Sequence, residues 1–167
     1  MTEFVIHLNR ETDHWPESLE PALLRATEAV LGACLRVPAE TVELGITLAD
    51  DATVHDLNRE HRDQDKPTNV LSFPLIDDFD DAEPEAPGVP LMLGDVILAF
   101  ETVAREAAGQ GKSLADHAVH LVVHGLLHLL GHDHRDDDEA EAMERLETGI
   151  LSRLGIADPY SSSPERP

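Results

Sequence analysis

The sequence predicts a single α/β domain of the α+β kind, and three observations lead to this prediction. The chain has 167 residues, which is close to the ~150 residues of one domain and long enough to bury a sizeable core. Hydrophobic residues make up 41% of the chain and are grouped in periodic segments, which argues against disorder. Strand-like runs alternate with helical patterns, and no internal repeat is visible. We expect one domain over residues 1–158, with four strands and about five helices.

The four predicted strands are short apolar runs. The first is a plain β-like run, and the second alternates apolar and polar residues with the period of a strand. The third is stopped by Pro74 or shortly after it, and the fourth leads directly into a helix. The predicted strands cover residues 4–8, 42–48, 70–73 and 94–98.

The five predicted helices have apolar residues at helical spacing. Pro16 opens the first helix, and Asp50 and Asp51 are candidate N-caps of the second. Ser113 is a plausible N-cap of the fourth. The fifth begins with acids, which suit a helix N-terminus. The predicted helices cover residues 16–35, 50–62, 100–109, 114–130 and 136–154.

Two further segments are expected to be mobile. Residues 77–90 contain six acids and three prolines, a composition typical of an acidic, proline-rich loop. Residues 159–167 are expected to form a flexible tail.

The charge balance of the chain is strongly acidic. Thirty-four acids against 12 bases give a formal net charge of −22, which disfavours generic binding of nucleic acid, because such binding depends on Lys and Arg. The acids concentrate in residues 77–85 and 136–147, away from the motifs described below. No signal peptide is predicted, and the most apolar stretch, residues 118–130, is shorter than a membrane span. We therefore expect a cytoplasmic protein with no membrane partner.

The histidines near the end of the fourth predicted helix have the spacing of metal ligands. His124 and His128 are one turn apart, so both rings can point at one cation. Gly131 can end the helix in a left-handed conformation, and His134 can return from the following turn as a third ligand. Three nitrogens and one open position predict a catalytic type of site that holds one Zn²⁺ per chain. The role of His132, in the same stretch, stays open.

The residue after His124 separates this pattern from that of the H-E-x-x-H metalloproteases. In those enzymes a Glu at this position is the general base, whereas this chain has Gly125. Peptide hydrolysis therefore lacks its usual base, although Zn²⁺ can still lower the pKa of bound water toward ~7. Cleavage of phosphodiesters fits better, provided that a cation stands near to bind the phosphate.

Three basic residues at a helix-to-strand junction are candidates for that cation. Arg59, Arg62 and Lys66 lie between the second predicted helix and the third strand, and an arginine can clamp a phosphate with two hydrogen bonds. Composition alone also allows them to be solvated charges that balance neighbouring acids. His120, on the same helix face as the two ligands, could contact substrate, support a ligand or simply pack.

Three motifs occur in order along the chain. They are Asp-Lys-Pro-Thr-Asn-Val-Leu-Ser-Phe-Pro at residues 65–74, Leu-Gly-Asp-Val-Ile at residues 93–97, and His-Gly-Leu-Leu-His-Leu-Leu-Gly-His-Asp-His at residues 124–134. Together they resemble the YbeY family of bacterial rRNA-maturation endoribonucleases over about residues 3–155. The resemblance implies a compact α/β fold with a mixed four-stranded sheet and a metal-binding helix like that of metalloproteases.

The same resemblance implies a function. It indicates a metal-dependent endoribonuclease that is specific for single strands and acts in 16S rRNA 3′-end maturation and ribosome quality control. His124, His128 and His134 match the zinc ligands of the family, and Arg62 matches its functional arginine. The implied partners are single-stranded RNA, rRNA, and the small ribosomal subunit or its assembly proteins. The chain departs from the family at His132, where an aromatic residue is usual, and in the acidic insert at residues 77–87.

Two other functions stay open on the sequence. One is a metalloprotease-like hydrolase with a displaced base, and the other is a non-enzymatic ribosome-assembly factor with structural zinc. The leading prediction is an RNA-cleaving Zn²⁺ enzyme in which Arg62 holds or neutralises the phosphate. It requires a small cationic cleft, formed with Arg59 and Lys66, on an acidic body. The nucleophile, water or the ribose 2′-OH, and the oligomeric state are open.

Overall fold

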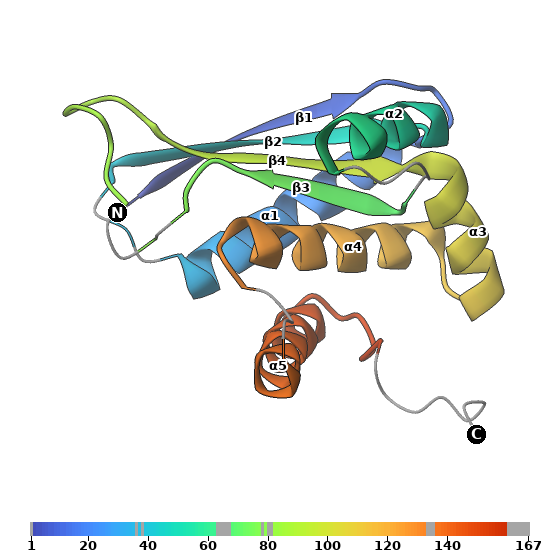
Figure 1. Cartoon of the computed structure of the whole chain (residues 1–167). Helices are drawn as coiled ribbons and strands as arrows, with labels where there is room; N and C mark the ends of the chain where they lie inside the picture. The colour runs from blue at the N-terminus through green and yellow to red at the C-terminus, as the bar shows by residue number, and fades with distance from the viewer. Residues whose placement is uncertain are drawn as a thin grey trace.

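A mixed four-stranded sheet lies at the centre of the molecule (Figure 1). Its strand order is β1-β2-β4-β3, in which β1, β2 and β4 are parallel and β3 runs antiparallel to β4 at one edge. The strands are β1 (Glu3–Arg10), β2 (Thr41–Ala49), β3 (Val70–Pro74) and β4 (Leu91–Ala99). The predicted mixed sheet of four strands is therefore confirmed.

Five α-helices surround this sheet, in the order that the sequence predicted. Helices α1 and α4 pack together below the sheet, α2 covers its opposite face near β3, and α5 lies on the side of α4 away from the sheet (Figure 1). A single 3-10 turn, η1 (Glu17–Leu19), precedes the first helix. The helices are α1 (Glu20–Cys34), α2 (Asp51–Arg62), α3 (Phe100–Gln110), α4 (Leu114–Leu129) and α5 (Asp137–Arg153).

The computed structural model describes most of the chain. The described residues are 2–35, 37, 39–62, 68–77, 79, 82–132 and 136–159, with the side chain of Arg62 left out. The expected tail, residues 159–167, lies outside this part except for Pro159. Among the described residues, no helix is both long enough and apolar enough to cross a bilayer.

The two faces of the sheet carry different parts of the core, as the alternation of strand side chains requires. The larger cluster lies on the face of α1 and α4 and includes Leu44, Val96 and Leu126, all at most 1% exposed. The smaller cluster, around Val54 and Leu71, lies under α2. Helix α4 is buried between the sheet and its neighbouring helices, so its polar residues lie in restricted surroundings.

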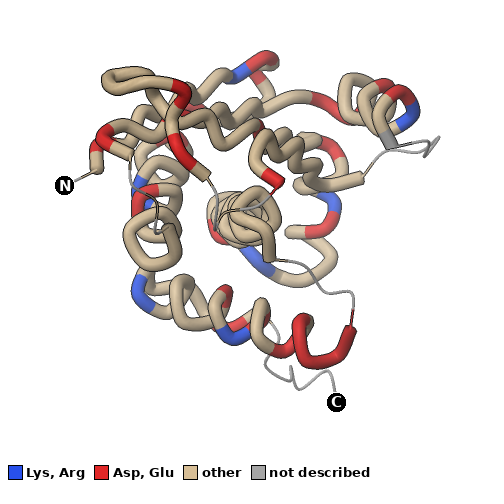
Figure 2. The backbone as a smooth tube through the Cα atoms, turned by 60° about the vertical axis from the view of Figure 1, so that its left-hand side comes forward, with Lys and Arg blue, Asp and Glu red and all other residues tan. Residues whose placement is uncertain are grey.

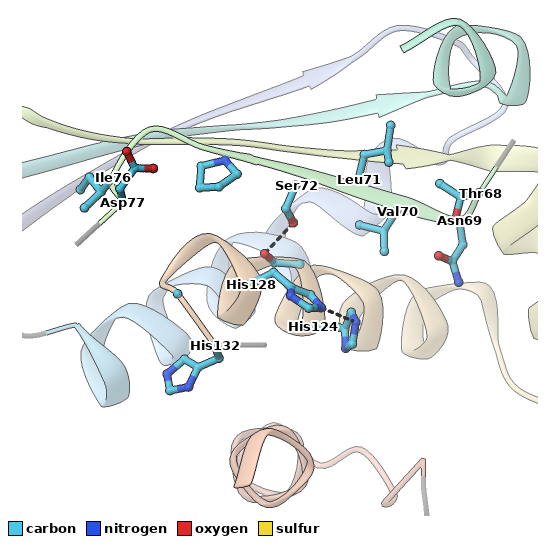
Figure 3. A pocket seen from close by; sticks show the side chains of 13 residues that line it. Thr68, Asn69, Val70, Leu71, Ser72, Ile76, Asp77, His124, His128 and His132 are labelled. Atoms are coloured by element: carbon cyan, nitrogen blue, oxygen red, sulfur yellow. Dashed lines mark hydrogen bonds between the residues drawn. The ribbon is translucent and has the colours of Figure 1, made fainter. Parts of the chain in front are cut away.

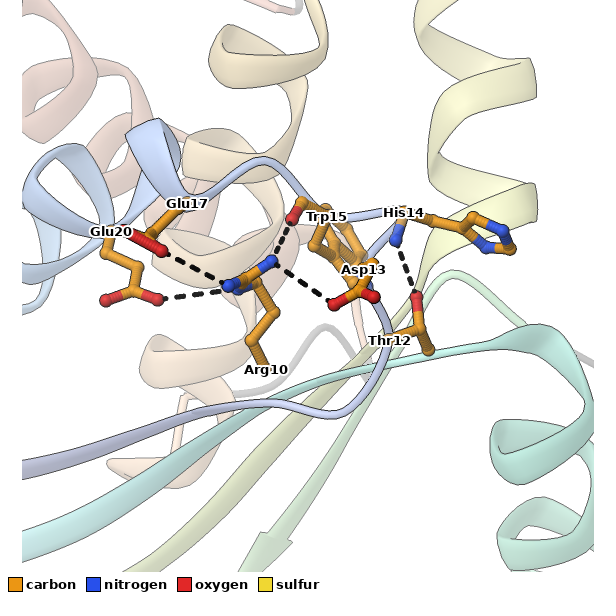
Figure 4. Close-up of polar contacts among 7 residues, drawn as sticks. All are labelled: Arg10, Thr12, Asp13, His14, Trp15, Glu17 and Glu20. Carbon is orange, nitrogen blue, oxygen red and sulfur yellow. Dashed lines mark hydrogen bonds and ion pairs between the residues drawn. The ribbon is translucent and has the colours of Figure 1, made fainter.

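A buried tryptophan fixes the corner between β1 and α1 (Figure 4). Trp15 is 0% exposed, its indole N–H donates to the carbonyl of Ala49 at 2.7 Å, and its ring stands edge-on to Phe100. Arg10 donates to the Trp15 carbonyl at 3.0 Å and pairs with Glu17 at 3.4 Å. These contacts hold the start of α1 against the ends of β1 and β2.

A predicted cap is confirmed at the start of α2, and α5 begins with a cap that the sequence interpretation did not name. Asp50 accepts a hydrogen bond from the backbone N–H of Thr53 at 2.8 Å, and this bond lowers the pKa of the Asp50 carboxyl. Asp136 accepts from the N–H of Glu139 at 2.8 Å. Acids fill the first turn of α5 (Figure 2), where the helix dipole favours negative charge.

Strand β4 begins earlier than the sequence predicted. It starts at Leu91, and between Leu91 and Gly94 its register against β2 shifts by one residue. Gly94 adopts a φ of 128°, and a side chain there would collide with the carbonyl of Phe73 on β3. The glycine that marked the start of the predicted strand is therefore part of a β-bulge inside it.

Candidate active site

The predicted ligands His124 and His128 line a cleft between β3 and α4 (Figure 3). The cleft has a volume of about 660 Å³. Its walls combine β3 and its flanks with the end of α4, so two of the three sequence motifs meet there. The lining residues are Thr68, Asn69, Val70, Leu71, Ser72, Pro74, Ile76, Asp77, His124, Gly125, His128, Gly131 and His132.

The two histidine rings face each other inside this cleft. The Nε2 atoms of His124 and His128 are 3.1 Å apart, and the ring centroids are separated by 4.6 Å. Two nitrogens that bind one tetrahedral Zn²⁺ at 2.0–2.1 Å lie roughly 3.4 Å from each other. The observed spacing is therefore close to that of two ligands of one ion.

Helix α4 ends shortly after these two histidines in a Schellman motif. Gly131 has a φ of 97°, its N–H donates to the His128 carbonyl, and the N–H of His132 donates to the Leu127 carbonyl at 2.9 Å. The predicted left-handed glycine is confirmed, as is the Ser113 cap, which accepts from the N–H of Asp116. Local sequence thus determines both ends of the helix that carries the histidines.

The predicted third ligand, His134, lies in residues 133–135, outside the described part of the chain. Among the described residues, no group of three histidine, cysteine or acidic side chains is arranged to hold a metal. The assignment of His134 remains a prediction.

The structure adds Glu147, which the sequence interpretation missed. This residue of α5 is 0% exposed, and its Oε1 accepts a hydrogen bond from His124 Nδ1 at 2.6 Å. Its Oε2 accepts from His120 Nε2 at 3.1 Å. A signal was present in the sequence, because Glu147 falls on the same helix face as Met143 and Ile150, which are buried.

The expectation that the acids lie away from the motifs is wrong at two positions. Glu147 contacts His124 because α5 packs along α4, and Asp77 lines the cleft because β3 leads directly past the histidines. The acidic loop is also anchored here, since the side chain of Phe79 lies close to Gly131. Both acidic segments therefore contribute to the surroundings of the cleft.

The other histidines of α4 occupy different environments. His117 is 3% exposed, and its Nε2 donates to Glu106 of α3 at 2.9 Å. Burial lowers the pKa of His117 more than the Glu106 contact raises it. Neither His117 nor His120 is among the lining residues of the cleft. The proposed contact of His120 with substrate stays a prediction.

His132 lines the cleft but stands apart from the ligand pair (Figure 3). Burial lowers the pKa of its imidazole. The neutral form of this ring is therefore favoured beside the site.

Gly125, at the position of the metalloprotease base, is required by close packing. A Cβ atom there would lie 2.8 Å from Val96 Cγ1 and 3.2 Å from Val70 Cγ2. The hydroxyl of Ser72 on β3 also donates to the Gly125 carbonyl at 2.8 Å. A glutamate at this position would collide with the sheet, so this fold cannot place the usual protease base beside His124.

Of the three predicted basic residues, the structure describes the side chain of one, Arg59. Arg59 is exposed on α2 and pairs with Asp56 at 2.9 Å. Arg62 is the last residue of α2, its side chain is outside the description, and Lys66 lies in the undescribed residues 63–67. No lysine or arginine occurs among the described residues that line the cleft. The cationic cleft remains a prediction.

Comparisons with known proteins agree with the motifs. The family described as "Endoribonuclease YbeY" matches residues 9–155. A protein named Endoribonuclease YbeY from Paramagnetospirillum magneticum is 58% identical over 148 residues, covering 87% of this chain and 89% of its own. One of the same name from Erythrobacter litoralis is 52% identical over 160 residues, with coverage of 92% and 96%.

A solved structure shows the same fold. The solution structure of TM1509 from Thermotoga maritima superimposes with a TM-score of 0.55 at 21% identity, covering 94% of this chain and 99% of its own. The relatives and the family match together cover nearly the whole chain, including the cleft and its histidines. The chain therefore belongs to the YbeY endoribonuclease family.

Proposed function

We propose that this chain is a zinc-dependent endoribonuclease that cleaves single-stranded RNA, with one Zn²⁺ per chain. We further propose that it acts in the cytoplasm, in 16S rRNA 3′-end maturation and ribosome quality control. Its partners would be the small ribosomal subunit or its assembly proteins. The observation that carries the proposal is the pair of Nε2 atoms, 3.1 Å apart, in an open cleft of a chain from this family.

The donor set fits a zinc ion. Imidazole nitrogen is a common zinc ligand, and the Nδ1 atom of His124 is already engaged by Glu147, which leaves Nε2 to face the cleft. In the proposal, His134 supplies the third nitrogen and one position stays open. Zn²⁺ bound in this way would supply Lewis acidity toward a phosphoryl oxygen.

The remaining roles belong to residues at the edge of the cleft. Helix α2 ends at Arg62, and residues 63–67 connect it to Thr68, which lines the cleft. In the proposal, Arg62 holds and neutralises the scissile phosphate. Arg59 and Lys66 would contact the neighbouring RNA backbone. The net charge of −22 would weaken non-specific binding of duplexes, so delivery by a partner would favour the correct RNA.

The alternatives are less compatible with the geometry. A structural zinc site normally fills all four positions with protein ligands, whereas this histidine pair opens into a cleft of about 660 Å³. A metalloprotease needs a base that the packing around Gly125 excludes from its usual position.

Cleavage of a labelled single-stranded RNA by zinc-loaded protein tests the proposal. We expect Arg62→Ala to lower kcat/KM by about 100-fold or more, because one charge-stabilising donor contributes roughly that much. His128→Ala should lose both zinc and cleavage while remaining folded. Arg25→Ala, a change of an exposed arginine on α1, is the matched control and should cleave like wild type.

Three results would contradict the proposal. They are cleavage that survives complete removal of zinc, an Arg62→Ala variant as active as the Arg25→Ala control, and a His128→Ala variant that unfolds. The last result would favour a structural metal. Zinc-dependent cleavage of casein by the same preparation would favour the protease alternative.

A further inference from the structure

Glu147 is a buried carboxylate that contacts two histidines of α4 at once. Burial of a lone carboxylate is costly unless hydrogen bonds compensate for the lost water. The side chain of Glu147 is 0% exposed, with Oε1 at 2.6 Å from His124 Nδ1 and Oε2 at 3.1 Å from His120 Nε2. Each carboxylate oxygen therefore accepts a hydrogen bond from a different histidine ring. These two bonds compensate for the loss of water around the buried charge.

The contact with Glu147 determines which nitrogen of His124 carries the proton. A neutral imidazole has one N–H donor and one lone pair, and an ionised carboxylate only accepts. The N–H of His124 is therefore on Nδ1, and the lone pair is on Nε2. That Nε2 atom is the one that lies 3.1 Å from His128 Nε2 in the cleft.

The same contact joins two helices on either side of the predicted third ligand. His124 and His128 are on α4, Glu147 is on α5, and residues 133–135 lie between these helices along the chain. Figure 1 shows α5 on the side of α4 away from the sheet, and the neighbours against which it mainly packs are α4 and α1. The buried hydrogen bonds of Glu147 therefore connect α5 directly to the helix that carries His124.

We propose that Glu147 is the positioning residue of the metal centre. It holds the His124 ring with Nε2 toward the cleft, and it acts through that ring without touching the ion, because it contacts Nδ1, the ring nitrogen that does not face His128. Carboxylates that accept from a ligating histidine orient the ring and raise its basicity. The proposal gives His120 the task of holding the second oxygen, in place of the substrate contact expected from the sequence. It rests on the proposed metal-dependent function and deepens it.

Zinc affinity measured by competition with a chromophoric chelator tests the role of Glu147. Glu147→Gln keeps the size of the side chain and removes its charge, and we expect it to weaken zinc binding by about 10- to 100-fold. Glu144→Gln is the matched control, because it makes the same chemical change at an exposed position of the same helix. The control should bind zinc like wild type.

A second measurement needs no variant, so it holds even if Glu147→Gln fails to fold. In metal-free wild-type protein, the ¹⁵N spectrum of the histidine rings should show the proton of His124 on Nδ1. A His124 ring protonated on Nε2, or a folded Glu147→Gln variant with wild-type zinc affinity, would overturn the proposal.

Different results would contradict the proposed function and the proposed role of Glu147. Wild-type protein that binds no zinc would overturn the proposed function and the role of Glu147 together. Wild-type protein that binds zinc and cleaves RNA, beside a Glu147→Gln variant with unchanged affinity and ring spectrum, would overturn the role of Glu147 alone.

Discussion

His117 and His124 lie on the same face of α4, and each pairs with a glutamate from a neighbouring helix, but their surroundings differ. In the first half of the helix, His117 donates to Glu106 of α3 at 2.9 Å, and in the second half, His124 donates to Glu147 of α5 at 2.6 Å. The two rings differ in what their second nitrogen faces. Nδ1 of His117 is buried, with no hydrogen-bond partner among the described residues, whereas Nε2 of His124 faces His128 in the cleft.

This difference shows that a histidine paired with a carboxylate is not by itself a metal site. The buried second nitrogen makes the pair at His117 a packing element that joins α4 to α3. The second nitrogen of His124 faces His128 in the cleft, so this pair is suited to bind a metal ion.

The largest expected effect on stability is that of a substitution at Gly125. This residue lies in the part of α4 that lines the cleft, where the helix packs closely on the sheet. We expect Gly125→Ala to lower the free energy of unfolding by up to about 2 kcal/mol. Overpacking costs about 1–3 kcal/mol, and the better helix propensity of alanine returns only about 1 kcal/mol. Urea unfolding followed by circular dichroism gives the value.

Gly149→Ala is the matched control for this prediction. Gly149 lies within α5, and a Cβ atom there would meet no other atom within 4 Å. The control should gain about 0.5–1 kcal/mol from helix propensity alone. If both glycines gave the same stabilisation, the close approach of α4 to β3 and β4 would be contradicted.

The smaller effect concerns the pH dependence of stability in the first half. Burial lowers the pKa of His117 from its usual 6.5, against the raising effect of Glu106 and with Lys112 and His120 also nearby. The unfolded chain therefore takes up this proton more readily than the folded one. The contribution of His117 to stability is full above about pH 6.5 and is lost as the pH falls through the lowered folded value.

His117→Gln removes the titrating ring and keeps a donor for Glu106. Between pH 7 and pH 5, chelator-treated wild type should lose more unfolding free energy than this variant, by up to about 1.4 kcal/mol for each unit of pKa shift. Urea titrations at several pH values supply the comparison. Parallel stability curves for the two proteins would show that His117 titrates in the folded state as it does in the unfolded chain.

Features set by neighbouring residues were predictable from the sequence. The caps at Ser113 and Asp50 and the left-handed turn at Gly131 each depend on only a few residues, and all are confirmed. The facing arrangement of the first two ligands also follows from helical spacing alone. The mixed sheet was predicted from the resemblance to the family.

Features set by packing between distant segments were not predictable in the same way. Glu147 is 23 residues from His124, and only the docking of α5 on α4 brings its carboxylate to the ring. Its place on the apolar face of α5 was visible, but the partner was not. In the same way, the sequence predicted the start of a strand at Gly94, because the register shift there depends on how β4 pairs with β2, a strand more than 40 residues away along the chain.

The most direct test of the contrast between the two halves of α4 is the ¹⁵N spectrum of the histidine rings before and after one equivalent of zinc. The account predicts that the Nε2 resonances of His124 and His128 shift on zinc binding, while both ring nitrogens of His117 keep their positions. A zinc-dependent shift at His117, or unchanged Nε2 resonances at His124 and His128, would contradict it.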